Sequence, residues 1–239
     1  PEVYYEIAGY YVAMQNSKAA RYNFEQAAKL APDNSTYLEK LGQFYISQNN
    51  YEDALTTYEQ LYTSNKTRED VLQILYQLYG AQNNYKKMIE MIERMELLSG
   101  ASEPLSLTKM QIYEQMGDKR KAQAELLRLV QKNPLELNYR VMLGNWLLQN
   151  NKKKEAYNEY QTVLKEDPNN AAAQLSLLDY YRDTKNEKMV DELTRKLLES
   201  KKTEKETKMA LLRQAIMDNQ DDSTKDSLEV IKLFNRVLS

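Results

Sequence analysis

Residues 35–68 read STYLEKLGQFYISQNNYEDALTTYEQLYTSNKTR, and this stretch decides the fold class. Apolar residues recur three and four positions apart in both of its halves, which is the spacing of amphipathic helices. They are Leu38, Leu41 and Tyr45 in the first half, and Ala54, Tyr58 and Leu61 in the second. The polar triplet Gln48-Asn49-Asn50 between the halves is typical of a turn. The stretch therefore predicts two short helices joined by a tight turn.

The same pattern recurs with a period of 34 residues along the whole chain. Three sets of equivalent residues lie on this period: Tyr11, Tyr45, Tyr79 and Tyr113; Ala20, Ala54, Ala122 and Ala156; and Pro32, Pro134 and Pro168. Helices of about 12–15 residues are too short to be stable alone in water, so each hairpin must bury its apolar seam against its neighbours. We expect an all-α stack of about seven repeats that spans residues 1–239 as one array, with repeats at 1–34, 35–68, 69–102, 103–136, 137–170, 171–204 and 205–238.

These positions resemble the tetratricopeptide repeat (TPR) family, whose signature combines W-x2-L-G-x2-Y, A-x3-F and a final Pro. In residues 35–68 the signature falls on Leu38, Leu41, Gly42, Tyr45, Ala54 and Tyr58. The resemblance implies an α-solenoid with a right-handed superhelical twist, whose first helices line a concave groove that binds proteins or peptides. The pattern weakens between Ser99 and Lys109, where Gly100 replaces the usual Pro and Lys109 takes a seam position. This region is either an irregular joint or a drifted part of an evenly stacked array.

The composition excludes most catalytic chemistry. The chain has 0 His and 0 Cys, which removes the commonest general base, the commonest metal ligand and the thiol nucleophile. No glycine-rich phosphate loop or nucleophile elbow occurs. We therefore expect a protein that is not an enzyme and that uses no cofactor or metal.

The charge and hydropathy of the chain limit the classes of partner that it is expected to bind. Lys+Arg 33 against Asp+Glu 35 gives a net charge of −2, which favours neither nucleic acid nor an anionic membrane. The mean hydropathy is −0.76, and no apolar run approaches the roughly 18 residues that a membrane span needs. We expect a soluble chain without direct membrane insertion. Its compartment stays open, with a lean towards a bacterial protein that is cytoplasmic or exported to the cell envelope.

One face of each first helix points away from the apolar seam. Its ninth position reads Gly9, Gln43, Gln77, Gln111, Asn145, Asp179 and Arg213 in successive repeats, with Gln115 and Gln149 one turn further along. Because an amide side chain both donates and accepts hydrogen bonds, a row of amides can pair with the backbone of an extended peptide. Asp179 and Arg213 would set the polarity at one end. The alternative is that glutamine is simply a good helix former on a solvated surface.

The fifth position of the later first helices is apolar. It reads Leu107, Val141, Leu175 and Met209. Exposed apolar surface usually marks a contact site, so this row is either a hydrophobic anchor for a peptide or a surface covered by a further part of the same protein.

The TPR resemblance also bears on one particular binding mode. Chaperone adaptors of this family capture acidic C-terminal tails with a clamp of Lys, Asn, Asn, Lys and Arg. The corresponding positions here read Tyr5, Gly9, Lys40, Asp70 and Ile74. Capture of an acidic tail in that manner is therefore disfavoured.

Both ends of the chain carry apolar helical patterns without a polar capping helix, which a complete solenoid normally has. At the C-terminal end the stripe is Leu228, Ile231, Phe234 and Leu238. We expect a segment of a longer polypeptide that acts as a non-catalytic interaction scaffold and binds an extended peptide or a partner helix. The alternative is a structural spacer or self-assembly module that forms homo-oligomers through its uncapped terminal helices.

Overall fold

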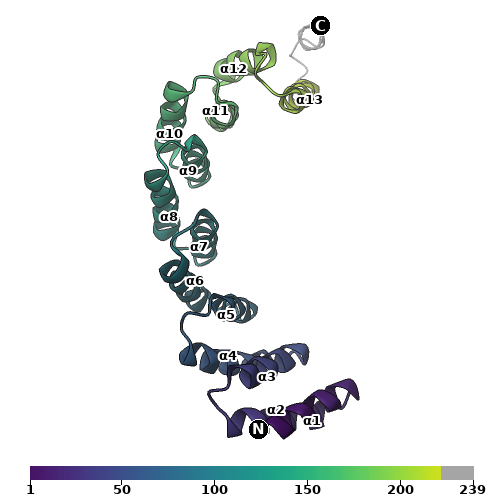
Figure 1. The fold of residues 1–239 in the computed structure, drawn as a ribbon. Coiled ribbons are helices and arrows are strands. Elements are labelled where there is room, and N and C mark those ends of the chain that lie inside the picture. The colour runs from purple at the N-terminus through teal and green to yellow at the C-terminus, as the bar shows by residue number, and fades with distance from the viewer. Residues whose placement is uncertain (222–239) are drawn as a thin grey trace. The chain divides into compact units, whose positions relative to one another are not determined.

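The computed structural model describes residues 1–221, which form thirteen helices and no strand. Figure 1 shows them in order along the chain. They are α1 (Glu2–Ala13), α2 (Ser17–Leu30), α3 (Ser35–Ser47), α4 (Tyr51–Ser64), α5 (Glu69–Ala81), α6 (Tyr85–Ser99), α7 (Glu103–Gln115), α8 (Lys119–Lys132), α9 (Leu137–Gln149), α10 (Lys153–Glu166), α11 (Ala171–Asp183), α12 (Glu187–Glu199) and α13 (Lys205–Asp221). The predicted all-α class is confirmed.

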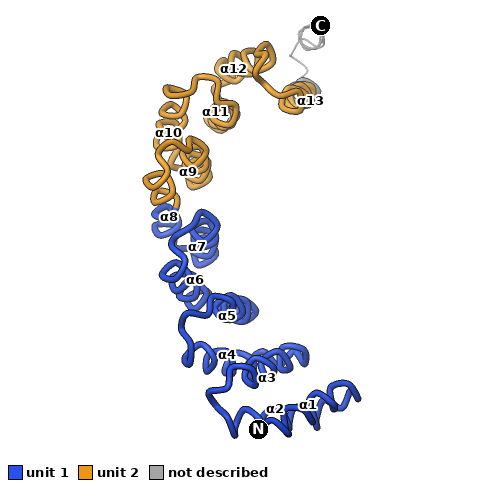
Figure 2. The backbone as a smooth tube through the Cα atoms, viewed as in Figure 1, with its two compact units in different colours: residues 1–125 blue, residues 126–239 orange. Residues whose placement is uncertain are grey.

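The helices alternate between first and second members of hairpins. From α3 onwards the first helices begin 34 residues apart, at Ser35, Glu69, Glu103, Leu137, Ala171 and Lys205. The chain divides into two compact units, Pro1–Glu125 and Leu126–Ser239, which Figure 2 shows in different colours. The single array of seven repeats stays a prediction.

In the second and third hairpins a polar triplet, Gln48-Asn49-Asn50 or Gln82-Asn83-Asn84, sets the tight turn. Asn49 and Asn83 adopt positive φ values of 57° and 54°, in the left-handed region that asparagine tolerates better than most residues. The next residue caps the second helix: the Asn50 side chain accepts a hydrogen bond from the Asp53 backbone N–H, and the Asn84 side chain accepts one from Lys87. The triplet thus ends one helix and starts the next within three residues.

The apolar seam forms the core of each hairpin, as its spacing predicts. In the second hairpin Leu38, Tyr58 and Leu61 are each 1% exposed, and Ala54 is fully buried. Gly42 lies against the Tyr58 ring so closely that a Cβ atom there would stand 2.7 Å from Cε2 of that ring. The glycine of the signature therefore allows the two helices of the hairpin to approach each other.

Tyrosine–glutamate hydrogen bonds join successive hairpins in the first unit. The Tyr45 hydroxyl donates to Oε1 of Glu25 at 2.7 Å, and the Tyr79 hydroxyl donates to Oε1 of Glu59 at 2.5 Å. Each bond links the second helix of one hairpin to the first helix of the next. The pKa of both tyrosines is raised well above the ordinary value. Burial is the larger cause, and the hydrogen bond to the carboxylate is the second.

These raised pKa values predict that the protein loses stability at alkaline pH. Above about pH 10 the unfolded chain releases the tyrosine protons while the folded chain keeps them, so the free energy of unfolding falls as the pH rises, by up to about 1.4 kcal/mol per pH unit for each tyrosine. Urea denaturation over a series of pH values should show a shallower decline for Tyr45→Phe/Tyr79→Phe than for the wild type. Tyr22→Phe, at an exposed tyrosine, should leave the slope unchanged. An equally steep decline in the double variant would contradict the assignment.

Candidate partner-binding surface

The glutamine row is exposed in the first unit. Gln43, Gln77 and Gln111 lie at the same position of α3, α5 and α7, and Gln115 is exposed at the last residue of α7. The Lys40 ammonium donates to Oε1 of Gln43 at 3.4 Å. In Figure 1, α5 and α7 lie on one side of this unit and α6 on the other. The amides of Gln43, Gln77 and Gln111 are therefore exposed to solvent on the first helices of this unit.

The row changes character in the second unit. Asn145 is half-buried, and its Oδ1 accepts a hydrogen bond from the Tyr160 hydroxyl at 2.9 Å. Gln149 and Arg213 are exposed, while the exposed Asp179 pairs with Arg182 on its own helix at 3.4 Å. Asn145 thus already serves the packing of its own hairpin, which the sequence pattern alone did not indicate.

The apolar row is less exposed than its position on the helix predicts. Leu107, Leu175 and Met209 are half-buried. Val141 is only 4% exposed and packs in a core cluster with Val163 and Ala173, so its predicted exposure is wrong. The reason is that α9 and α11, which are both first helices, pack against each other. The side of α9 that carries Val141 is therefore covered.

A pocket of about 450 Å³ opens in the first unit between α5, α6 and α7. Its floor is apolar, with Ile92 and Met95 almost completely buried and Leu105 half-buried. Gln77 of the amide row lies on its wall, beside Gln73. In this pocket a residue of the predicted amide row lies next to an apolar surface. The sequence did not predict this combination.

The pocket lies at the connection that the sequence marks as irregular. Helix α6 ends at Ser99, Gly100 adopts a φ of 86°, and Ser102 caps α7. Ser99, Gly100 and Ser102 all line the pocket. A left-handed φ of this kind favours glycine, which explains why Gly100 takes the place of the usual proline. The departure from the signature at this connection thus coincides with a glycine backbone conformation, and the first helices on either side of it still begin 34 residues apart.

Lys109 is a buried cation next to this connection. Only 5% of the residue is exposed, and its Nζ lies 3.0 Å from Oε2 of Glu96 and 2.9 Å from Oε1 of Glu125. Burial opposes the charged form, but hydrogen bonds and charge attraction from both carboxylates outweigh it and raise the pKa of Lys109. Three charged side chains from α6, α7 and α8 thus replace an apolar contact at a seam position.

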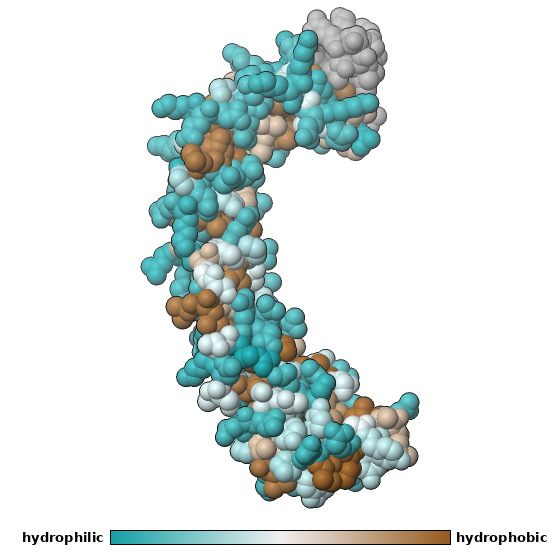
Figure 3. Space-filling model, viewed as in Figure 1, coloured by the Kyte–Doolittle hydropathy of each residue, from teal (hydrophilic) through white to brown (hydrophobic). Residues whose placement is uncertain are grey.

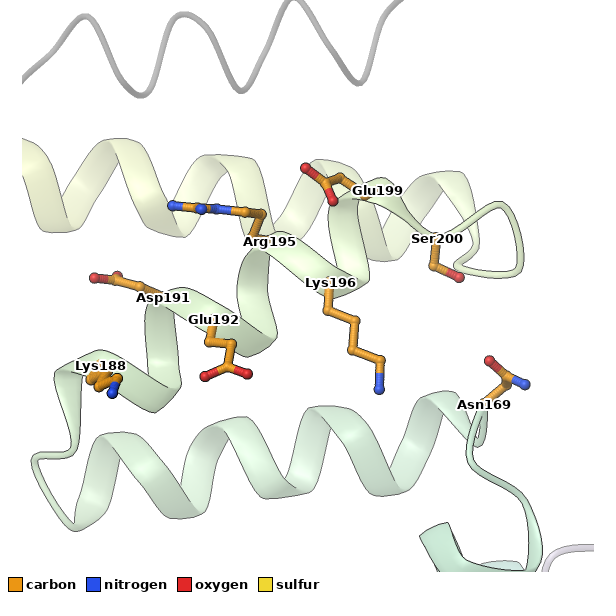
Figure 4. Close-up of a pocket in the computed structure, with 8 residues that line it drawn as sticks. All are labelled: Asn169, Lys188, Asp191, Glu192, Arg195, Lys196, Glu199 and Ser200. Carbon is orange, nitrogen blue, oxygen red and sulfur yellow. The ribbon is translucent and has the colours of Figure 1, made fainter.

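The second unit has a different hollow beside α12, with a volume of about 640 Å³. Figure 4 shows its lining, which comes mainly from α12. The six charged residues that line it are Lys188, Arg195 and Lys196, and Asp191, Glu192 and Glu199. Because cations and carboxylates are equal in number and interleaved, this hollow has no charge preference. It lies on a second helix, away from the residues that the sequence singles out.

Among the residues that the structure describes, no three His, Cys, Asp or Glu side chains gather in a way that could hold a metal ion. No described helix is both long and apolar enough to span a membrane. The predicted C-terminal stripe with Phe234 lies outside the described residues.

Comparisons with known proteins find one family profile and several solved structures that are similar to this chain. A family profile described as tetratricopeptide repeat matches residues 5–68 and 107–171. No curated protein sequence matches. Among solved structures, one of MamA has 18% identity and a TM-score of 0.44, covering 69% of this chain and 96% of that one. YrrB, titled a TPR protein with an unusual peptide-binding site, has 19% identity and a TM-score of 0.43, covering 72% and 88%. A tetratricopeptide repeat protein from Parabacteroides merdae ATCC 43184 has 13% identity and a TM-score of 0.44, covering 100% and 98%.

Proposed function

Because the chain belongs to the tetratricopeptide repeat family, whose members generally mediate protein–protein interactions, we propose that it is a non-catalytic scaffold that binds an extended peptide. The binding surface is the first-helix face of residues 1–125. One observation carries the proposal: Gln43, Gln77 and Gln111 are exposed at the same position of three successive first helices.

The chemistry of the amide row suits an extended backbone. A peptide in extended conformation presents N–H and C=O groups along its length, and each amide side chain offers two donors and one acceptor. The net contribution of such a hydrogen bond is about 0.5–1.5 kcal/mol, so three amides would contribute more than a tenfold gain in affinity. The helices that carry the amides are held by the buried seam, so the protein backbone needs no reordering when a peptide binds.

The test begins with peptides selected on the protein from a random display library. Fluorescence anisotropy then compares their affinity for the wild type and for Gln43→Ala/Gln77→Ala/Gln111→Ala. We expect the triple variant to bind at least tenfold more weakly. Circular dichroism should show unchanged helicity, because alanine is a good helix former.

A matched control removes three glutamines from second helices. Gln26, Gln131 and Gln161 lie on α2, α8 and α10, and their replacement by alanine should leave affinity unchanged. Equal affinities for the wild type and the Gln43/Gln77/Gln111 variant would refute the proposed surface.

A second candidate function is self-assembly through a terminal helix. One stripe of α1 exposes large apolar residues: Val3 is 70% exposed, Ile7 39%, Tyr10 63% and Met14 at the helix end 59%. Figure 3 shows apolar atoms gathered over the first hairpin. This side of α1 is the one that a neighbouring hairpin covers elsewhere in the unit, so a second copy of the chain could pack against it.

Sedimentation over a range of concentrations separates the two functions. Self-assembly through α1 predicts dimers that grow with concentration and that disappear in Ile7→Glu/Tyr10→Glu. A wild-type protein that stays monomeric at all concentrations would remove this candidate.

A further inference from the structure

The pocket between α5, α6 and α7 has an interior that suits an apolar side chain. Ile92 is 1% exposed and Met95 5% exposed, and both line the pocket together with the half-buried Leu105. A volume of about 450 Å³ lies within the range of sites that hold small ligands or side chains. Such an apolar floor gains most from a large aliphatic group, which releases water from both surfaces.

The wall of the pocket carries polar groups whose hydrogen-bonding capacity is unused. Gln73, Tyr76 and Gln77 line it, and within the described chain their side chains make no hydrogen bond. The Tyr76 hydroxyl is a neutral donor, and burial raises its pKa. Apolar floor and polar wall together match an aliphatic side chain attached to a peptide backbone.

The first helices of the unit that holds the pocket carry more carboxylates than cations. The first helices of this unit contain seven carboxylates and two lysines: Glu2, Glu6, Glu39, Glu69, Asp70, Glu103 and Glu114, against Lys40 and Lys109. Lys109 is buried between Glu96 and Glu125, so it presents no charge to a partner.

One carboxylate lies at the pocket itself. Arg68 pairs with Glu39 at 2.7 Å and with Asp70 at 2.5 Å. The Glu69 carboxylate accepts a neutral hydrogen bond, from the Ser99 hydroxyl at 2.5 Å. It is the single charged residue among the described residues that line the pocket. The surroundings therefore attract a cation and repel an acidic segment.

We propose that this pocket holds an aliphatic side chain of an extended partner segment in which a lysine or arginine stands next to that residue. The aliphatic group packs on Ile92, Met95 and Leu105, the segment's backbone pairs with Gln73 and Gln77, and the neighbouring cation lies towards Glu69. This assignment rests on the proposed function and adds to it the chemical class of the partner.

The test uses short synthetic peptides, acetylated and amidated, with a central leucine between lysines. Anisotropy should show binding to the wild type that weakens about tenfold when the leucine is replaced by alanine, because a buried leucine contributes roughly 1.5–3 kcal/mol. Replacing the lysines by glutamates should weaken binding at least tenfold at low salt, because two attractions are exchanged for two repulsions. Absence of binding by the lysine–leucine peptide, or equal binding by the glutamate peptide, would overturn the proposal.

Two protein variants locate the contact. Thr108 lines the pocket, and its Oγ1 donates to the Pro104 carbonyl at 2.7 Å. Thr108→Phe should fill the pocket and lower affinity at least tenfold. Thr63, on α4, makes the equivalent bond to the Glu59 carbonyl at 2.8 Å, so Thr63→Phe is the matched control and should bind like the wild type.

The charge contribution has its own pair of variants. Glu69→Gln should weaken the lysine–leucine peptide about threefold at low salt, the size of an exposed ion pair, and Glu52→Gln on α4 should not. Full affinity in both Thr108→Phe and Glu69→Gln would overturn this inference. Peptides selected from the library offer one more test. If their affinity depends on Gln43, Gln77 and Gln111 but they lack a basic residue beside an aliphatic one, this inference is overturned and the proposed function stays intact.

Discussion

Lys109→Ala should destabilise the first unit by about 3 kcal/mol, the scale measured when one partner of a buried ion pair is removed. Lys109 contacts Glu96 and Glu125 at 3.0 and 2.9 Å, and each of the two carboxylate side chains is 12% exposed. Without the ammonium the two carboxylates repel each other in a site of low polarity, where water screens charge poorly. Urea denaturation measures the change in the free energy of unfolding.

A matched control separates the buried contact from the loss of a lysine as such. Lys121 is 54% exposed on its side chain and lies 3.6 Å from Asp118. Lys121→Ala should therefore cost no more than about 1 kcal/mol, as exposed ion pairs do. Similar losses in both variants would contradict the structural role of Lys109.

Replacement of the whole triad gives a second check. In Lys109→Met/Glu96→Gln/Glu125→Gln no charge remains in the site, so most of the stability lost in Lys109→Ala should return. Because repeat proteins transmit stability mainly between neighbours, hydrogen exchange should locate the damage of Lys109→Ala in α6, α7 and α8. Uniform exchange across both units would contradict this.

The fold followed from local signals that do not depend on distant parts of the chain. The 34-residue period fixed which residues form the seams, and the triplets such as Gln48-Asn49-Asn50 marked the hairpin turns. Both signals act within one repeat, where the spacing of apolar residues and the left-handed preference of asparagine suffice. The helix bounds therefore agree with the period.

The candidate site was only partly predictable because it depends on packing between repeats. The exposure of Gln43, Gln77 and Gln111 follows from the helical phase alone. Val141 also lies on the side of its helix that faces away from the seam, yet α11 covers it. The sequence marked Lys109 as an exception, but its partners Glu96 and Glu125 stand on other helices, and no local spacing connects the three. The pocket likewise arises from the geometry of one connection.

Gly144→Ala should destabilise the second unit by up to about 2 kcal/mol, although alanine is the better helix former. A Cβ atom at Gly144 would stand 2.4 Å from Cε1 of Tyr160. Tyr160 is fully buried, and its hydroxyl donates to Asn145, so the ring has no room to move away. The cost of overpacking, about 1–3 kcal/mol, exceeds the gain of about 1 kcal/mol in helix propensity.

The same chemical change should have the opposite sign at Gly9, in the middle of α1. A Cβ atom there meets nothing within 4 Å, so Gly9→Ala should stabilise its unit by about 0.5–1 kcal/mol through helix propensity alone. Gly42→Ala repeats the Gly144→Ala experiment in the first unit, because a Cβ atom at Gly42 would lie 2.7 Å from Cε2 of Tyr58. Thermal and urea denaturation of the three variants give the comparison.

A double variant identifies the ring as the cause. In Gly144→Ala/Tyr160→Leu the smaller side chain leaves room for the new methyl group, so the added cost of Gly144→Ala should largely vanish against a Tyr160→Leu background. An unchanged cost in that background would mean that the helix backbone, and not the tyrosine ring, requires glycine. The signature glycine would then act through chain flexibility, and the close approach of the paired helices would no longer explain why it recurs at Gly42 and Gly144.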